Sequence, residues 1–288
     1  MNSKICQICF NNIDQIHDAD HEKQCLENQI KLLYEYQKDT LTIKQQKALE
    51  FSLKKSRIFS KNIHENLMLK FIERGLNGKD LENVVNYVKS VPVIIHVNLD
   101  KTLKYFVNDI YYKNLFETRT TGGSNWLDGR IDWENQLFNN IYHDAENSER
   151  VKYGTLNITN NTAGVNCCKG YGDSYLILKE HVKDRITFIY GDSSKKDLHI
   201  CTFKHFNSIL LFIEDKLLNE IIEIANNKKN NSTILYGMYI EAQIHGQVNF
   251  NKDIELLMVN KKHNTDSNIK NLLDEFSENH EVPYLWIE

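Results

Sequence analysis

Three side chains of different chemistry, a carboxylate, an amide and an imidazole, recur at every second position late in the chain. Glu241, Gln243 and His245 are separated by single apolar residues. Because successive side chains of a β-strand point to opposite faces, a strand within the stretch 233–250 would place all three on one face. Gly246 follows at once, and a glycine lets a ligand approach the backbone closely. This face can therefore stabilise a positive charge, exchange a proton or bind a metal ion.

A second chemically capable group lies near the N-terminus. Its spacing is Cys-x2-Cys-x11-His-x3-Cys, formed by Cys6, Cys9, His21 and Cys25. A tight knuckle can supply the first pair of ligands, and one helical turn brings residues four apart onto one face. We therefore expect residues 1–30 to form a small zinc finger. Since so short a segment cannot bury a core, the metal would supply most of its folding free energy.

A third group falls between these two. His96 and Asn98 interrupt an otherwise apolar stretch, 93–99, that is typical of a buried strand. Downstream, Gly122 and Gly123 lie among hydroxyl side chains, and such a loop can expose backbone N–H groups to a phosphate or a ribose. The hydroxyl residues in question are Thr118, Thr120 and Ser124.

The elements that must position these groups follow from periodicity and turn residues. A helix is expected to open at Thr42 with Gln45 as the partner in a capping box. Further helices are expected at 60–74, 80–89, 133–142, 208–226 and 267–278, and strands at 152–158, 174–179, 186–190 and 254–259. These patterns predict an α+β protein in which a zinc finger (1–30) and a helical connector (31–92) precede a mixed or antiparallel split-sheet domain with flanking helices (93–288).

Composition narrows the classes of partner. The 288 residues carry 35 basic and 39 acidic side chains and a formal charge of −4. We therefore expect no broad cationic face, which makes a nucleic-acid partner unlikely. The sequence shows neither a long apolar run nor a secretory leader, so we expect a cytoplasmic protein without membrane contact. Six cysteines in two distant groups do not resemble an extracellular disulfide framework.

Several blocks of the sequence, taken in order, resemble an uncharacterised family that is found mainly in bacteria. The resemblance covers about residues 40–288. Its most specific blocks are Tyr-Gly-x-Leu-Asn at 153–157 and Glu-Ala-Gln-x-His-Gly at 241–246. The family implies a shared fold and no assigned activity.

The order of the blocks also resembles, more distantly, the plan of ADP-ribosyltransferases. That plan has a His or Arg on an early strand, a hydroxyl-rich segment and a Glu on a late strand. It implies transfer of ADP-ribose from NAD to a protein, as an effector or toxin would perform it, with Glu241 stabilising the positive charge on the ribosyl group. The implied catalytic residues are Glu241, His96 and Gln243, and the implied NAD-binding residues are His96, Thr118, Thr120, Gly122, Gly123, Ser124, Tyr153 and Gly154.

Two other classes of function remain open. In a metal-dependent hydrolase, His96, Glu241 and His245 would bind a divalent ion and activate water. In a non-enzymatic adaptor, the zinc finger would bind a partner and the large domain would serve as a scaffold. The finger is similar to small Cys-Cys-His-Cys fingers that include the ubiquitin-binding type, which implies ubiquitin or a ubiquitinated protein as the partner.

Overall fold

An eight-stranded sheet runs through the centre of the molecule. The computed structural model describes residues 40–60, 62–120, 126–233 and 238–287, with short pieces nearer the N-terminus at 4–5, 12–13, 21, 23–25, 27–28 and 30–31. In these residues the strand order is β12-β11-β6-β3-β5-β9-β7-β8. The strands are β3 (Val93–Val97), β5 (Lys152–Leu156), β6 (Ser174–Leu178), β7 (Ile186–Tyr190), β8 (Ile200–Thr202), β9 (Ile240–Ile244), β11 (Ile254–Asn260) and β12 (Tyr284–Ile287).

Neighbouring strands of this sheet are antiparallel, except that β11 and β12 are parallel. The fold is thus mixed α and β with a mostly antiparallel sheet, as the sequence predicts. The strands follow one continuous hydrogen-bonded order, although we expected a split sheet. Two short pairs lie apart from it: β1 (Lys4–Ile5) with β2 (Asn12–Ile13), and β4 (Tyr111–Tyr112) with β10 (Val248–Asn249).

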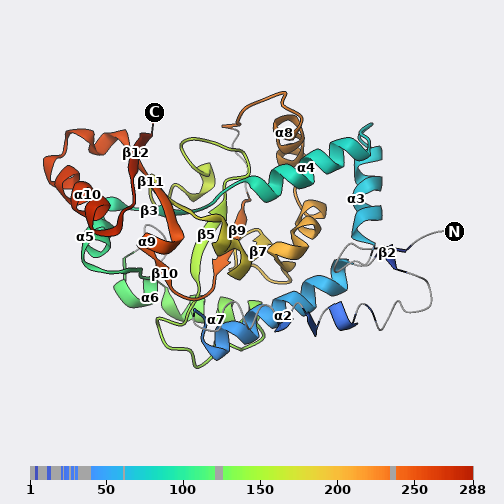
Figure 1. Cartoon of the computed structure of the whole chain (residues 1–288), viewed down its shortest axis with the longest axis horizontal. Coiled ribbons are helices and arrows are strands. Elements are labelled where there is room, and N and C mark those ends of the chain that lie inside the picture. The colour runs from blue at the N-terminus through green and yellow to red at the C-terminus, as the bar shows by residue number, and fades with distance from the viewer. Residues whose placement is uncertain are drawn as a thin grey trace.

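Helices cover the sheet and close its ends. Figure 1 shows α2 on one side of β7 and the pair α4 and α8 on the other, with α5 and α10 together at the end near β12. The α-helices are α2 (Ile43–Ser60), α3 (Ile63–Ile72), α4 (Gly78–Ser90), α5 (Leu99–Asn108), α6 (Leu115–Thr118), α7 (Leu127–Leu137), α8 (Asp215–Ala225), α9 (Phe250–Asp253) and α10 (Ser267–His280). The 3₁₀ helices are η1 (Asn166–Cys168), η2 (Glu180–Arg185), η3 (Phe203–Leu211) and η4 (Lys261–Thr265).

Helix α2 begins as the sequence predicts. The backbone N–H of Thr42 donates to Gln45 Oε1 at 2.8 Å, and the N–H of Gln45 donates to Thr42 Oγ1 at 3.4 Å. This reciprocal pair satisfies two N–H groups that the first helical turn leaves without partners. Within the expected connector, α2 packs on β8 and η3, α3 on η3, and α4 on α8. The connector helices therefore belong to the packed body of the protein.

The prediction of one continuous helix at 208–226 is wrong. The segment is divided into η3 and α8, which are separated at residues 212–214. The ammonium group of Lys70, on α3, donates to the carbonyls of Leu210, Leu211 and Ile213 at 3.0–3.2 Å. A side chain distant in sequence thus satisfies carbonyls that a continuous helix would have bonded internally.

Two further boundaries differ from the expectation. Helix α7 begins at Leu127 and ends at Leu137, earlier than the predicted 133–142. Asn139 and Asn140 follow it with φ of 52° and 60°, and asparagine tolerates this left-handed region better than most residues. Asn98 is no part of strand β3, because its side chain accepts the N–H of Lys101 at 3.3 Å as the N-cap of α5.

The strand that the sequence singles out is shorter than 233–250 and is covered on both faces. It is β9, and all five of its residues are buried. It pairs with β5 and β7, so that Glu241 lies opposite Thr155 on one side and Ile189 on the other. Gly246 has φ of +80°, and a Cβ there would lie 2.8 Å from the carbonyl oxygen of Thr40. The close approach at this glycine is therefore to backbone of the same chain.

Candidate functional site

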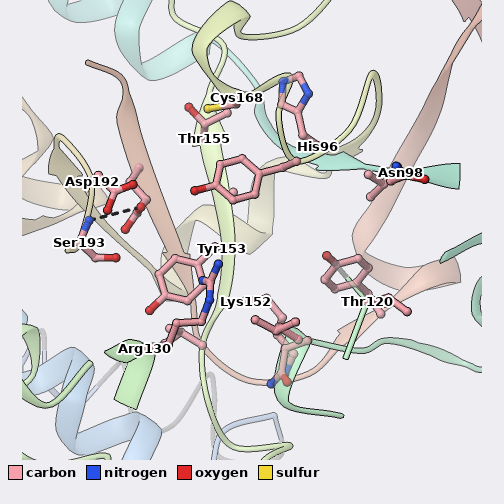
Figure 2. Close-up of a pocket in the computed structure, with 18 of the residues that line it drawn as sticks. His96, Asn98, Thr120, Arg130, Lys152, Tyr153, Thr155, Cys168, Asp192 and Ser193 are labelled. Carbon is pink, nitrogen blue, oxygen red and sulfur yellow. Dashed lines mark hydrogen bonds between the residues drawn. The ribbon is translucent and has the colours of Figure 1, made fainter. Parts of the chain in front are cut away.

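A pocket opens beside the central strands β3, β5 and β9. Its atom-free space, open mouth included, is about 950 Å³. His96 of β3, Tyr153 of β5 and Glu241 of β9 all line it. Figure 2 shows Asp192 and Tyr153 on one side of the pocket, with Asn98 on the opposite side. Residues that lie far apart in the sequence thus share one cavity.

Glu241 is held in this pocket by three hydrogen-bond donors that carry no charge. The residue is buried, with 4 % of its surface exposed. Oε1 accepts from Gln243 Nε2 at 2.9 Å, and Oε2 accepts from Tyr239 OH at 3.1 Å and from the Ser193 backbone N–H at 3.5 Å. The carboxylate is therefore oriented by fixed dipoles, while one edge of it faces the cavity.

The electrostatics of Glu241 follow from this setting. Burial raises the pKa of its carboxyl group to about 7, and the nearby Asp192 adds to the rise. The hydrogen bonds from Gln243, Ser193 and Tyr239 lower the pKa in turn. A buried carboxyl group of this kind changes its charge near neutral pH, as groups that act in catalysis often do.

Asp192 and Tyr239 are site residues that sequence reasoning did not select. Tyr239 OH lies 3.2 Å from Asp192 Oδ2 and 3.1 Å from Glu241 Oε2, so its single proton is shared between the two carboxylates, and both Tyr239 and Asp192 line the pocket. The sequence Tyr-Gly-Asp-Ser at 190–193 contains the signal, but a Gly-Asp pair is also common in turns. The turn is present too, because Asp192 Oδ1 accepts the N–H of Ser194 at 2.9 Å.

Aromatic rings and one arginine line much of the remaining pocket. The guanidinium of Arg130 lies over the rings of Trp133 and Tyr153, at 5.8 and 5.7 Å from their centroids. Arg130 was not selected from the sequence, whereas Tyr153 and its neighbour Gly154 were, and all three line the pocket. The aromatic residues of the lining are Tyr112, Phe116, Trp133, Tyr153, Tyr171 and Tyr239.

His96 reaches the pocket with both ring nitrogens engaged. Nδ1 donates to the carbonyl of Gly172 at 2.8 Å, and Nε2 accepts the N–H of Val165 at 3.0 Å. Burial lowers the pKa of His96 to about 4, so the ring is neutral at physiological pH. The two ring nitrogens thus hold the loops that contain Gly172 and Val165. A ligand would contact the edge of the ring, or would have to replace one of these two hydrogen bonds.

Gln243 lies on the same face of β9 as Glu241, as the alternation predicts, and His245 follows directly after the strand. Both are fully buried, and neither lines the pocket. Gln243 acts on Glu241 through its amide, whereas both nitrogens of His245 are engaged with Thr187 and Tyr142. Gln243 therefore affects the pocket only indirectly, through its hydrogen bond to Glu241.

The hydroxyl-rich segment is described in part. Thr120 lines the pocket, and its Oγ1 lies 2.7 Å from Oγ1 of Thr118 at the end of α6. Gly122, Gly123 and Ser124 lie outside the described residues.

The expected zinc ligands are likewise described in part. His21 Nε2 and Cys25 Sγ lie 3.3 Å apart, while Cys6 and Cys9 fall outside the described residues. Over the part of the chain that the structure describes, no group of three or more His, Cys, Asp or Glu side chains could hold a metal ion. Among these residues, His96, Glu241 and His245 thus do not converge on a common ligand position.

In the described residues, no helix has the length and apolar character needed to span a bilayer.

A search of curated proteins finds no match to this chain. Residues 98–225 match a family described as protein of unknown function (DUF3626). This confirms part of the resemblance, although the match is shorter than the expected 40–288 and includes neither His96 nor Glu241. The match thus covers the middle of the chain, from the N-cap of α5 to the end of α8.

Proposed function

We propose that this protein cleaves the bond between nicotinamide and ribose in NAD and transfers the ADP-ribosyl group to a protein. The observation that carries the proposal is Glu241, a buried carboxylate with neutral hydrogen-bond donors in a pocket lined by aromatic rings. In this reaction the carbon–nitrogen bond breaks, and its electron pair leaves with nicotinamide. Positive charge then develops on the ribose, as in the cleavage of glycosides.

The ionised Glu241 suits this step. Since its hydrogen-bond partners among the described residues carry no positive charge, its negative charge is available to the ribosyl group in the transition state. Such an interaction accelerates the reaction because it is stronger in the transition state than with bound substrate. The acceptor side chain then attacks the same carbon and loses a proton, for which Asp192 is the neighbouring carboxylate of the pocket.

The remainder of the lining fits the other parts of a dinucleotide. Aromatic faces such as those of Trp133 and Tyr153 can stack on planar rings. Arg130, between them, brings a positive charge that suits a diphosphate. The aromatic rings and the positive charge of the cavity therefore suit the planar rings and the diphosphate of NAD.

The test compares the wild type with Glu241→Gln, which keeps the size of the side chain and removes its charge. Release of labelled nicotinamide from NAD and transfer of labelled ADP-ribose to lysate proteins are measured with the full chain. We expect Glu241→Gln to reduce both rates by at least about 100-fold. Glu255→Gln, the same change at an exposed position on β11, is the control and should behave as the wild type.

Two results would contradict the proposal. A wild-type protein that neither releases nicotinamide nor transfers label removes the reaction altogether. Full activity of the Glu241→Gln protein would remove Glu241 from it.

We also propose that Cys6, Cys9, His21 and Cys25 bind one structural zinc ion. Bond lengths to a tetrahedral zinc predict a separation of about 3.6 Å between a histidine nitrogen and a cysteine sulfur. The 3.3 Å between His21 Nε2 and Cys25 Sγ is close to this value. The zinc would fold the N-terminal segment, and the folded segment would recruit the protein substrate, for which ubiquitin is the first candidate.

Metal analysis of the full chain tests the zinc site, and labelled ubiquitin tests the partner. We expect one zinc per chain, lost in Cys25→Ser and retained in the control Cys201→Ser, whose thiol is buried on β8. Amide signals of ¹⁵N-labelled ubiquitin should shift on addition of the zinc-loaded protein and should not shift with Cys25→Ser. A metal-free wild type would remove the site, and unshifted ubiquitin signals would remove this partner.

A further inference from the structure

We propose that a hydrogen-bond chain running in one direction through the core holds the Glu241 carboxylate in its working position. The chain passes from Tyr142 through His245 and Thr187 to Gln243, and we call it the orienting chain. It joins β7, β9 and the turn after α7. The inference rests on the proposed role of Glu241 as the group that acts on the substrate. Thr187, His245 and Tyr142 are thereby positioning residues.

The direction of the orienting chain begins with the amide of Gln243. Its Nε2 donates to Glu241 Oε1 at 2.9 Å, so its carbonyl oxygen faces Thr187 Oγ1 at 3.0 Å. A carbonyl oxygen can accept but not donate a hydrogen bond. The hydroxyl of Thr187 must therefore donate its single proton to Gln243.

The same proton count fixes the tautomer of His245. Thr187 Oγ1 also lies 3.2 Å from His245 Nε2. Because the hydroxyl proton is already directed at Gln243, this contact requires a hydrogen on Nε2, which donates to the hydroxyl oxygen. In a neutral ring Nδ1 then carries a lone pair, and it accepts the O–H of Tyr142 at 2.7 Å. Every donor in the chain thus points toward Glu241.

The environment of His245 keeps the ring neutral. The residue is fully buried, and its pKa is lowered to about 3 by burial first and then by the charges of Arg185 and Lys152. Phe138 meets the ring edge-on with centroids 5.2 Å apart. A neutral ring fixed by packing has one donor and one acceptor, which the chain uses fully.

The end of the orienting chain that lies farthest from Glu241 is in the core. Tyr142 is 0 % exposed and packs in a cluster with Leu137, Phe138 and Ile189. A chain that begins at a buried tyrosine is suited to hold a geometry, whereas a proton conduit would need a connection to solvent. Its effect on Glu241 is to occupy Oε1, so that the carboxylate edge toward the pocket stays in one orientation.

Loss of the link at Thr187 should therefore change the acidity and the activity of Glu241 together. In Thr187→Val the amide of Gln243 loses the donor that fixes its orientation, and Glu241 loses part of its stabilising hydrogen bond. The pKa of Glu241 should rise, since hydrogen bonds to a carboxylate lower its pKa. We expect kcat to fall on the order of 10-fold while KM stays within about twofold.

The matched variants are Thr187→Ser and Thr202→Val. Serine keeps the hydroxyl and should restore the wild-type values. Thr202 is the cross-strand partner of Thr187 on β8, and its Oγ1 is buried without a hydrogen-bond partner among the described residues. The same Thr-to-Val change there leaves the orienting chain intact, so Thr202→Val should match the wild type.

Three measurements decide the inference. ¹⁵N NMR of the full chain at pH 7 should show the Nε2–H tautomer of His245, identified by comparison with His245→Asn. Carboxyl ¹³C NMR should show a higher pKa of Glu241 in Thr187→Val than in wild type or Thr202→Val. Steady-state nicotinamide release should show the loss in kcat with KM preserved.

The inference is overturned by an Nδ1–H tautomer of His245 in the wild type, or by an unchanged pKa of Glu241 in Thr187→Val. Should Thr187→Val not fold, Tyr142→Phe removes the first donor instead, and the wild-type tautomer needs no variant at all. If the wild type releases no nicotinamide, the proposed function fails, while the two NMR measurements still decide whether the orienting chain exists.

Discussion

Two buried glutamates, one on a helix and one on the central sheet, have similarly raised pKa values but different hydrogen-bond partners. Glu134 on α7 and Glu241 on β9 each have a pKa raised to about 7, with burial as the largest cause. Glu134 accepts from Arg150 Nη1 at 2.8 Å, and both partners of this ion pair are buried. The donors to Glu241 are neutral, and the charged group that adds to the rise of its pKa is another carboxylate, Asp192.

The difference separates structure from function. The charge of Glu134 is balanced inside the protein, and removal of either partner would leave the other as an uncompensated buried charge. The charge of Glu241 has no such balance within the described residues, which makes this carboxylate unfavourable for stability and available to a substrate. Tyr153 lies between the two regions, because its hydroxyl donates to Glu134 Oε1 at 3.4 Å while the residue lines the pocket.

The largest expected effect is on stability, and it concerns Glu134. We expect Arg150→Met to lower the free energy of unfolding by about 3–5 kcal/mol, because it leaves the Glu134 carboxylate buried and unpaired. Denaturant unfolding at pH 8 measures the change, with the exposed Glu255→Gln as control. An unfolding free energy equal to that of the wild type would mean that the two glutamates do not differ in this way.

Glu241→Gln should have the opposite sign and a smaller size. The folded-state pKa of Glu241, about 7, lies above its ordinary value of 4.5, so the folded protein binds the proton more tightly. The resulting stabilisation is present below pH 4.5 and is lost as the pH rises through 7. At pH 8.5 we expect Glu241→Gln to be more stable than the wild type by on the order of 1–3 kcal/mol, and at pH 4.5 the gain should disappear. Unfolding curves at the two pH values decide, and a gain independent of pH would contradict the assignment.

The smallest expected effect is on the pH dependence of activity. In the proposed reaction the ionised form of Glu241 is the active one, so kcat/KM for nicotinamide release should rise with pH through about 7. For a single ionisation at this pKa, the rate at pH 8 exceeds that at pH 6 by about tenfold. A profile that is flat over this range would show that ionisation of Glu241 does not control the reaction.

Local patterns predict the parts of this fold that depend on local residues. The strands expected at 152–158, 174–179 and 186–190 are confirmed as β5, β6 and β7, because turn residues bound them on both sides. The start of α2 was predictable because its two capping groups, Thr42 and Gln45, are three residues apart. In each case the interacting groups lie within a few positions of one another.

Distant contacts explain what the patterns could not predict. Residues 208–226 have one continuous apolar stripe, and the break between η3 and α8 depends on Lys70 from another helix. The site shows the same limit. Glu241 was predictable from alternation within one strand, whereas Asp192 and Arg130 join it only through the way the sheet brings separate loops and helices together. The same holds for Thr187, which lies opposite Gln243 on the neighbouring strand.

The order of strands in the sheet also determines when the pocket can form. Strand β5 lies between β3 and β9, so its partners come from residues 93–97 on one side and 240–244 on the other. Contacts between residues so far apart in sequence form slowly, because a long loop must close before they stabilise the chain. The cavity is thus complete only when one of the last strands to be synthesised has joined the sheet. A ligand bound there would stabilise the whole folded domain against unfolding, and a fragment ending before β9 would lack Glu241 and the pocket wall that it forms.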